Sequence, residues 1–252
     1  MNKTIVCVSP HLDDAVFSVG GLIASLTDQG HQAHVVTCFT QSVTNPKGFA
    51  LACQLDKGLS ADVDYMQLRR EEDRTACQQL GAKPHWLDLL EAPHRGYYSA
   101  ADLFNGANPQ DTVPTKLQNR LSHIIKTLKP DILLLPIGIG DHIDHQQVIS
   151  AVKSLQLPIH QYQWYDQPYY ANNAHLKPDE AIAIQPAEWI NEMSNQSRIL
   201  AIDITQYTDR KIKACEAYTT QVKFQFKDNS VYAVLNQVGI HQEILVKSSS
   251  VK

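Results

Sequence analysis

Residues 4–14 read TIVCVSPHLDD and residues 131–145 read DILLLPIGIGDHIDH, and the expected fold follows from these two stretches. In each of them, a short apolar run leads into a turn that carries His and Asp. The run Thr4–Val8 predicts a β-strand, and Ile132–Leu135, the most apolar run of the chain, is typical of a central strand buried on both faces. Strands buried in this way occur in parallel sheets whose faces are covered by helices.

A strand–helix–strand unit begins with the first stretch. Apolar residues recur from Asp14 to Leu26 with the period of a helix, and Gly30 is a typical stop signal after them. The next apolar segment, His34–Phe39, predicts a second strand. Two strands separated by one helix indicate parallel pairing with a right-handed crossover.

The rest of the chain continues this alternation. The expected helices cover residues 65–80, 116–128, about 146–155 and 206–221, and the expected strands cover residues 85–89, 161–165, 181–184 and 199–204. Helices that alternate with strands predict an α/β fold, Rossmann-like, with three layers and a mostly parallel central sheet. Neither a repeat nor a linker divides the chain, so we expect residues 1–252 to form one domain.

Two long stretches, residues 40–62 and 91–115, lack a clear helical or strand period and contain several Pro and Gly. We interpret both mostly as loops. Long loops in compact domains are often functional, so we expect these two to determine which substrate the protein accepts. At the other end of the chain, we expect one more helix in the final stretch of about twenty residues, followed by a frayed Ser/Lys tail.

The composition is that of an ordinary soluble protein. Hydrophobic residues make up 43% of the 252 residues, which is enough apolar mass for a core, and charged residues make up 19%. The formal net charge of −4 is too mild for a protein that binds nucleic acid through its electrostatic field. We therefore expect no nucleic-acid partner. We also expect no membrane span, because no stretch approaches the roughly 20 apolar residues that one needs.

The cysteines and the first residues indicate a cytoplasmic protein. The five cysteines are odd in number and widely spaced, without a Cys-x-x-Cys pair, which is typical of reduced thiols. The first residues hold one Lys and a short apolar run that soon meets Asp13 and Asp14. Because a long apolar region and a cleavage motif are both missing there, we do not expect a secretory signal peptide.

Polar side chains capable of chemistry follow both predicted strands of the opening stretches. His11, Asp13 and Asp14 come after the first, and residues 141–145 (DHIDH) come after the second, so three His and four Asp lie in two short loops. The carboxyl ends of parallel strands meet at one edge of a sheet, where ligands bind. Helix capping would explain one Asp, but it does not explain two Asp with a His three residues earlier. We therefore predict a metal site.

The residue types narrow the identity of the metal. Two imidazoles and one carboxylate with open coordination positions suit Zn²⁺ in a hydrolytic site, and the same triad suits non-haem Fe²⁺. Asp13 is a spare carboxylate beside such a triad, and a hydrolase needs a base next to the attacking water. We therefore favour Zn²⁺, with another divalent metal such as Fe²⁺ as the alternative.

These motifs resemble those of the PIG-L, or LmbE-like, family of zinc-dependent N-acetyl-sugar deacetylases. Residues 11–14 (HLDD) resemble the family's His-Pro-Asp-Asp turn, and residues 142–145 (HIDH) resemble its His-x-Asp-His motif. Weaker resemblances cover most of the chain: an Arg-x-x-Glu helix ending in Leu-Gly at 69–81, an aromatic–acidic–Pro-Tyr segment at 164–169, and a Lys-Ala…Tyr-x-x-Gln helix at 213–221. Leu12 and Ala15 depart from the usual Pro and Glu, and neither position is a metal ligand in the family pattern.

The resemblance implies a role for each residue of the two motifs. The three implied ligands of Zn²⁺ are His11, Asp14 and His145. Asp13 would be the general base that activates the attacking water. His142 would stabilise the developing oxyanion as an imidazolium, and Asp144 would orient His142. The implied reaction is hydrolysis of an N-acetyl group on an N-acetylglucosamine-like sugar or sugar conjugate.

Four further residues are candidates for binding the substrate. Arg69 could bind an anionic or hydroxyl-rich part of it, Trp164 and Tyr169 could stack on a sugar ring, and His94 could line the pocket. Two alternatives to a sugar deacetylase stay open: a metal-dependent amidase on a thiol or other small-molecule conjugate, and a non-catalytic sugar- or nucleotide-binding module. A serine hydrolase is disfavoured, because the sequence has no Gly-x-Ser-x-Gly turn.

Overall fold

The two opening stretches form adjacent strands at the centre of the sheet. The computed structural model describes residues 2–178, 180–191, 199–227 and 229–248. These residues form one eight-stranded sheet in the order β3-β2-β1-β4-β5-β8-β7-β6. The strands are β1 (Thr4–Ser9), β2 (Gln32–Phe39), β3 (Lys83–Leu89), β4 (Ile132–Pro136), β5 (His160–Trp164), β6 (Ala181–Ile184), β7 (Ile199–Asp203) and β8 (Gln242–Lys247). The strand positions expected from the sequence are therefore confirmed, with the exception of β8.

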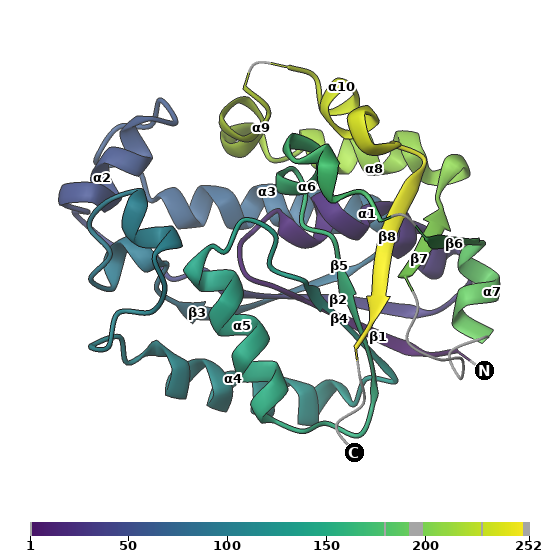
Figure 1. Ribbon diagram of the computed structural model, residues 1–252. Coiled ribbons are helices and arrows are strands. Elements are labelled where there is room, and N and C mark those ends of the chain that lie inside the picture. Colours follow the sequence, from purple (N-terminus) through teal and green to yellow (C-terminus); the bar gives the residue numbers. More distant parts are fainter. Residues whose placement is uncertain (1, 179, 192–198, 228, 249–252) are drawn as a thin grey trace.

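Helices cover both faces of this sheet, which confirms the expected three-layer α/β fold (Figure 1). One face carries α1 (Asp14–Asp28), α3 (Tyr65–Leu80) and α8 (Thr208–Glu216). The other face carries α4 (Val113–Leu128) and α5 (Ile143–Ser154). The remaining helices are α2 (Gly48–Leu55), α6 (Tyr169–Asn172), α7 (Pro186–Asn191), α9 (Thr219–Phe226) and α10 (Val231–Leu235), with short 3₁₀ turns that include η1 (Ala92–His94) and η2 (Ala101–Phe104).

Every neighbouring pair of strands is parallel except the two pairs that contain β8, which runs antiparallel to β5 and β7. We expected a helix in the final residues, and α10 lies at the start of that range, but the strand was missed. Its sequence, QEILVK, is too short to reveal a strand by its period. It becomes a strand because β5 and β7 supply hydrogen bonds on both of its edges. The Ser/Lys tail beyond residue 248 lies outside the described residues.

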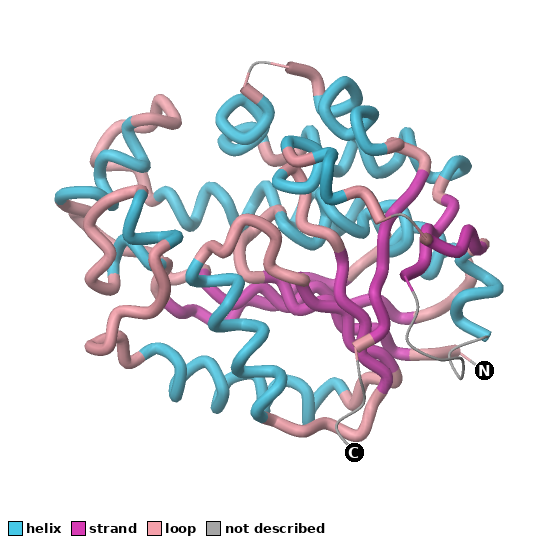
Figure 2. Tube along the Cα trace, viewed as in Figure 1, coloured by secondary structure: helices cyan, strands magenta, loops and turns pink. Residues whose placement is uncertain are grey.

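Two other expectations of secondary structure were wrong in part. The stretch 40–62 is not all loop, because Gly48–Leu55 forms α2. The helix expected at 206–221 breaks after Glu216, and α9 starts at Thr219. Glu72 of α3 explains the break, because its carboxylate accepts hydrogen bonds from the hydroxyls of Thr219 and Thr220 at 2.6 and 2.7 Å. The chain therefore bends to bring α9 towards the carboxyl edge of the sheet, where loops gather (Figure 2).

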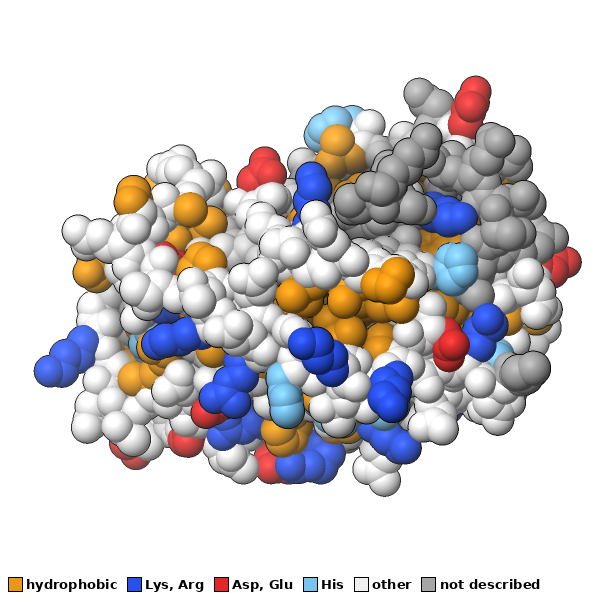
Figure 3. Space-filling view, turned by 90° about the horizontal axis from the view of Figure 1, so that it is seen from below, with side chains coloured by type: hydrophobic (Ala, Val, Ile, Leu, Met, Phe, Trp, Pro, Cys, Tyr) orange, Lys and Arg blue, Asp and Glu red, His pale blue; other side chains and the backbone are white. Residues whose placement is uncertain are grey.

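Charged side chains are spread over the surface, and the described helices are not long and strongly apolar, as the composition leads one to expect. On the face of the molecule seen from below, basic and acidic side chains are interspersed with apolar ones (Figure 3). Across the four described ranges, no helix is both long and apolar enough to cross a membrane.

A buried carboxylate from β8 holds α1 against the sheet. Helix α1 has a non-helical residue, Val19 (φ −132°, ψ 24°), which leaves nearby backbone N–H groups without helical acceptors. The carboxylate of Glu243 accepts hydrogen bonds from the N–H groups of Gly21 and Leu22, both at 2.8 Å. The ammonium of Lys211 in α8 lies 2.8 Å from the same carboxylate, and both side chains are almost fully buried. This contact ties α1, α8 and β8 together.

We expect Glu243→Gln to lower the free energy of unfolding by about 3–5 kcal/mol, because the variant leaves the Lys211 ammonium buried without a counter-charge. Urea unfolding followed by circular dichroism measures the change. The matched control is Glu216→Gln, since Glu216 is an exposed residue of the same helix as Lys211 and should change stability by no more than about 0.5 kcal/mol. A loss below about 1 kcal/mol for Glu243→Gln would contradict this account.

Candidate metal centre

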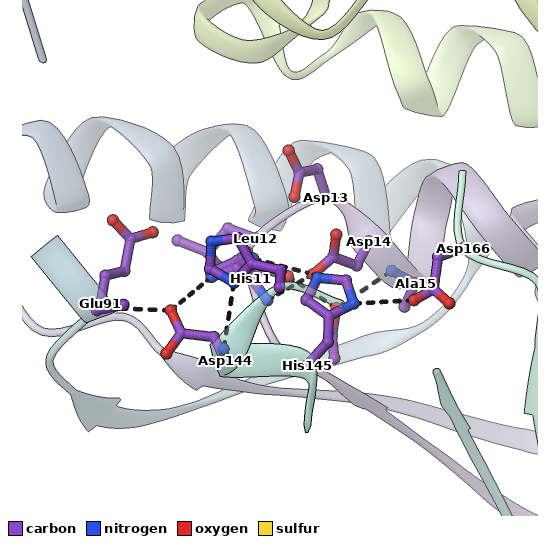
Figure 4. A network of polar contacts seen from close by, with 12 residues as sticks. His11, Leu12, Asp13, Asp14, Ala15, Glu91, Asp144, His145 and Asp166 are labelled. Carbon is purple, nitrogen blue, oxygen red and sulfur yellow. Dashed lines mark hydrogen bonds and ion pairs between the residues drawn. The ribbon is translucent and has the colours of Figure 1, made fainter. Parts of the chain in front are cut away.

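The pairing of β1 with β4 brings the two His/Asp motifs together. The strands are parallel neighbours, with Ile5 opposite Ile132 and Cys7 opposite Leu134. Their carboxyl ends therefore lie side by side, and the turns that follow them converge at one point (Figure 4). The pairing of these two strands thus brings together two motifs that lie more than 120 residues apart in the sequence.

The three predicted ligands converge on one small space. Nδ1 of His11 and Nε2 of His145 each lie 3.3 Å from Oδ2 of Asp14. The donor atoms of these three residues all fall within 4.8 Å of one another. Nε2 of His145 is buried and has no hydrogen-bond partner within the described structure. A buried imidazole nitrogen without a partner, facing a carboxylate and a second imidazole, is the arrangement that a divalent cation such as Zn²⁺ requires.

Each of the two imidazoles is oriented by a second carboxylate. Nε2–H of His11 donates to Oδ2 of Asp144, and Nδ1–H of His145 donates to Oδ1 of Asp166, both at 2.9 Å. A carboxylate on the outer nitrogen fixes the tautomer, so the inner nitrogen presents its lone pair to the metal position. Asp166 is fixed in turn by the N–H groups of Gly138 and Ile139, at 2.8 and 2.9 Å.

The pKa shifts of His145 and Asp14 indicate that this group stabilises positive charge. Burial by itself lowers the pKa of His145, but attraction to Asp14 and Asp166 and the hydrogen bond from Nδ1–H to Asp166 outweigh it and raise that pKa to about 10. Burial by itself raises the pKa of Asp14, but His145 and His11 hold it well below its usual range. The carboxylates thus stabilise positive charge among the ligand atoms. A divalent cation would replace those protons, because ligating imidazoles must be neutral.

Asp13 lies beside this group with features of a general base. Its side chain is 3% exposed, and its Oδ2 has no hydrogen-bond partner in the described structure. Burial raises its pKa to about 7, although the nearby Arg69 guanidinium lowers it. Its backbone (φ 156°, ψ −37°) is rare for a residue other than glycine. Strained backbone at a buried ionisable residue is typical of functional sites, and a pKa near neutrality suits a general base.

The guanidinium of Arg69 contacts Asp13 and other protein groups, so most of its hydrogen-bonding capacity is used within the protein. Its guanidinium donates to Oε1 of Glu91 at 2.7 Å and to the carbonyl of Leu12 at 3.0 Å, and it lies 3.5 Å from Oδ1 of Asp13. The side chain borders the pocket but is almost fully buried. Because two of its nitrogens are already paired, the expectation that Arg69 binds the substrate directly is not favoured by this geometry.

The structure corrects the expected relation between Asp144 and His142. The carboxylate of Asp144 bonds His11 rather than the ring of His142. The contact between the two residues runs the other way, since the backbone N–H of Asp144 donates to Nδ1 of His142 at 3.2 Å. Burial lowers the pKa of His142 to about 3, so its ring is neutral and carries its proton on Nε2. This neutral form presents an N–H donor in place of the expected imidazolium.

A pocket of about 650 Å³ opens over the group, and the two irregular stretches supply much of its wall. Tyr169 and His94 line it, as expected for residues that touch a substrate. Trp164 does not, because it is 0% exposed inside β5 and packs in the core. The expectation that Trp164 stacks on a sugar was therefore wrong: along a strand, a side chain can face the core just as well as a ligand.

Sequence reasoning missed several residues of the site. Asp166 follows β5 at the same edge of the sheet, and its position after a strand was the signal that could have revealed it. Phe49 and Phe104 line the pocket from within the two stretches expected to be functional. Phe224 lines it from α9, and nothing in the local sequence points to that role.

Comparison with known proteins places this arrangement among related chains. The family model described as PIG-L, GlcNAc-PI de-N-acetylase, matches residues 6–156. The chain is 33% identical over 147 residues to the 2'-N-acetylparomamine deacetylase of Streptomyces fradiae, over 58% of this chain and 50% of that protein. It is 28% identical over 122 residues to the 4-oxalmesaconate hydratase of Pseudomonas putida, over 46% and 45% respectively. The chain therefore spans about half the length of the curated relatives it matches.

Solved structures share the fold over the whole chain. The A40926 pseudoaglycone deacetylase Dbv21 has a TM-score of 0.78 and 25% identity, with 100% of this chain and 99% of that chain covered. The 4-carboxy-2-hydroxymuconate hydratase GalB of Pseudomonas putida has a TM-score of 0.58 and 19% identity, with 99% and 97% covered. The overall fold described above is therefore common to these proteins.

We expect Asp166→Ala to weaken Zn²⁺ binding about 10- to 100-fold, because His145 loses the acceptor that orients its ring. Competition with a chromophoric chelator measures the affinity. Asp203→Ala is the matched control, since Asp203 also lies at the carboxyl end of a strand, and its carboxylate accepts hydrogen bonds from Gln185 and Thr205 instead of from an imidazole. Unchanged Zn²⁺ affinity in Asp166→Ala would argue against a ligand role for His145.

Proposed function

This chain belongs to the PIG-L family, and we propose that it is a zinc-dependent hydrolase that removes an N-acetyl group from a sugar or sugar conjugate related to N-acetylglucosamine. One observation carries the proposal: a buried carboxylate, Asp13, whose Oδ2 has no hydrogen-bond partner in the described residues, adjoins a His₂Asp group at the base of a large pocket. Amide hydrolysis needs that combination of a base and an electrophilic centre.

The ligands His11, Asp14 and His145 would hold Zn²⁺. When bound, the ion would lower the pKa of water to about 7 and polarise the amide carbonyl. Asp13 accepts the proton of the attacking water, and in its protonated form it hands that proton to the departing nitrogen. A positioned base of this kind typically contributes roughly 10²–10⁴-fold to the rate. The C–N bond of the amide breaks, a C–O bond forms, and the products are acetate and an amine.

His142 supplies the third element that the reaction needs. Its neutral ring presents Nε2–H at the pocket wall, where it donates a hydrogen bond to the oxygen that gains charge as water adds to the carbonyl. Loss of one such donor typically costs about 10²–10³-fold in kcat. The ring of Phe104 packs edge-on against His142, with a centroid separation of 5.5 Å, and helps to hold this orientation.

The size and lining of the pocket favour a sugar conjugate over a free sugar as the substrate. Its 650 Å³ volume lies within the range that holds drug-sized ligands, and part of its wall is aromatic and aliphatic. Phe104 and Phe224 remain 44% and 51% exposed although they line it. Exposed aromatic side chains that border a ligand site favour an apolar group beside the sugar.

Deacetylation is favoured over the hydration reaction that one relative is named for. The deacetylase of Streptomyces fradiae is the more similar of the two curated relatives, at 33% against 28% identity. The A40926 pseudoaglycone deacetylase is also more similar in structure than the hydratase GalB, with a TM-score of 0.78 against 0.58. We further propose that the protein works in the cytoplasm, where its five free thiols would stay reduced.

We expect Asp13→Asn to keep the metal and to lose roughly 10²–10⁴-fold in kcat, because the amide cannot accept the proton of the water. Asp14→Ala should lose the metal itself, because it removes the carboxylate shared by both imidazoles. Acetate release and metal content are measured on the same preparations. Near-normal turnover by Asp13→Asn on a confirmed substrate would disprove the base assignment.

We expect kcat/KM to rise with the length of the alkyl group in a series of alkyl N-acetylglucosaminides, by up to about fourfold per fully buried methylene. Phe224→Ala should flatten that dependence. The control is Tyr232→Ala, which removes an aromatic side chain that is 47% exposed outside the pocket. No acetate release from any member of the series, with cleavage of a thiol-conjugate amide, would favour the amidase alternative. A protein that binds no metal and cleaves neither would favour the binding module.

A further inference from the structure

Two overlapping sets of ligands share His11. One set contains Asp14 and His145, and the other contains His142 and Asp144; in each set the donor atoms lie within 4.8 Å of one another. Both sets offer two imidazoles and one carboxylate, so the types of donor do not decide which of them holds a metal. The difference between the sets lies in what else the two carboxylates bind.

Arg95 engages the carboxylate of the second set. Its Nη2 donates to Oδ1 of Asp144, and its Nη1 donates to Oδ2 of Asp111 and, at 2.9 Å, to Oε1 of Gln147. The side chains of Arg95 and Asp144 are 6% and 0% exposed. The guanidinium also lies over the ring of Phe39, 4.9 Å from its centroid. Arg95 is therefore fixed on both sides and cannot easily leave Asp144.

The other oxygen of Asp144 is occupied as well. Oδ2 accepts from the N–H of Ala92 at 3.1 Å and from Nε2–H of His11 at 2.9 Å. Asp14 differs, because its ion-pair partners in the described residues are the two imidazoles of the first set, beside one backbone hydrogen bond from His11 N–H at 2.8 Å. Asp14 can exchange imidazole protons for a metal ion, whereas Asp144 would first have to release Arg95.

We propose that Arg95 is a positioning residue that selects between the two ligand sets. It holds Asp144 as the acceptor of His11 Nε2–H, and this hydrogen bond turns Nδ1 of His11 towards Asp14 and His145. The same contact keeps Asp144 from joining His142 in a competing metal site. His142 therefore remains free to donate to the substrate. This inference rests on the metal site of the proposed function.

The test replaces Arg95 by Met or Gln and measures metal binding without substrate. We expect Zn²⁺ affinity, from competition with a chromophoric chelator, to fall about tenfold, at the lower end of the range for loss of an orienting partner. We also expect the visible spectrum of the Co²⁺-loaded protein to change, because Asp144 and His142 can then compete with Asp14 and His145 for the metal bound to His11. Arg95→Lys keeps a cation beside Asp144 and should recover part of the wild-type affinity and spectrum, because an ammonium cannot make all the bonds of the guanidinium.

Controls separate selection of ligands from loss of structure. Arg70→Met removes an arginine that bonds the carbonyl of Thr40 and the hydroxyl of Ser42, away from both ligand sets, and should leave metal affinity unchanged. Thermal midpoints are recorded for every variant, and the Gln variant serves if the Met variant does not fold. Wild-type affinity and spectrum in a folded Arg95→Met or Arg95→Gln would overturn the inference while leaving the proposed function intact. Failure of the wild-type protein to bind metal would instead overturn the proposed function.

Discussion

The parallel pairing of β1 with β4 is the interaction on which the site depends. It places the turn after Ser9 beside the turn after Pro136, and so joins two motifs that are remote in sequence. The rest of the structure keeps this pairing buried: α1 and α3 cover one face, and α4 and α5 cover the other. Glu243 extends the constraint to the C-terminal region, because it ties β8 to α1. A ligand site at the carboxyl edge of a parallel sheet is the consequence expected of this topology.

Buried charge at that edge is organised by pairing each imidazole with carboxylates on both sides. His11 lies between Asp14 and Asp144, and His145 lies between Asp14 and Asp166. Buried carboxylates need such partners, because an unpaired charge in the interior is costly. Asp13 is the exception, because burial raises its pKa and the Arg69 guanidinium, 3.5 Å from its Oδ1, offsets this only in part. The same electrostatic logic separates the ligands, which are ionised and paired, from the residue proposed as the base.

Most of the fold and the content of the site could be predicted from the sequence, but the orientation of side chains could not. The residues in the two motifs were identified because their spacing after apolar runs is local information. Trp164 was placed wrongly because a strand residue faces either the core or a ligand, and only the neighbouring layers decide which. The sequence could not show that the Arg69 guanidinium is already paired, because its partners, Glu91 and Leu12, come from other segments. Asp144 was assigned to His142, its neighbour in sequence, although its carboxylate turns to His11.

By itself, the sequence determined the alternation of strands and helices, the placement of His and Asp in two motifs that follow apolar strands, and the family of the chain. These properties depend on the periodicity of apolar residues and on the spacing within short motifs, and both can be read directly from the sequence. Only the tertiary structure decided that β8 inserts between β5 and β7, that Asp166 accepts a hydrogen bond from His145, and that Arg95 bonds the carboxylate of Asp144. Each of these contacts joins segments that are distant along the chain, and their energies arise from burial and charge pairing that exist only after the layers have packed.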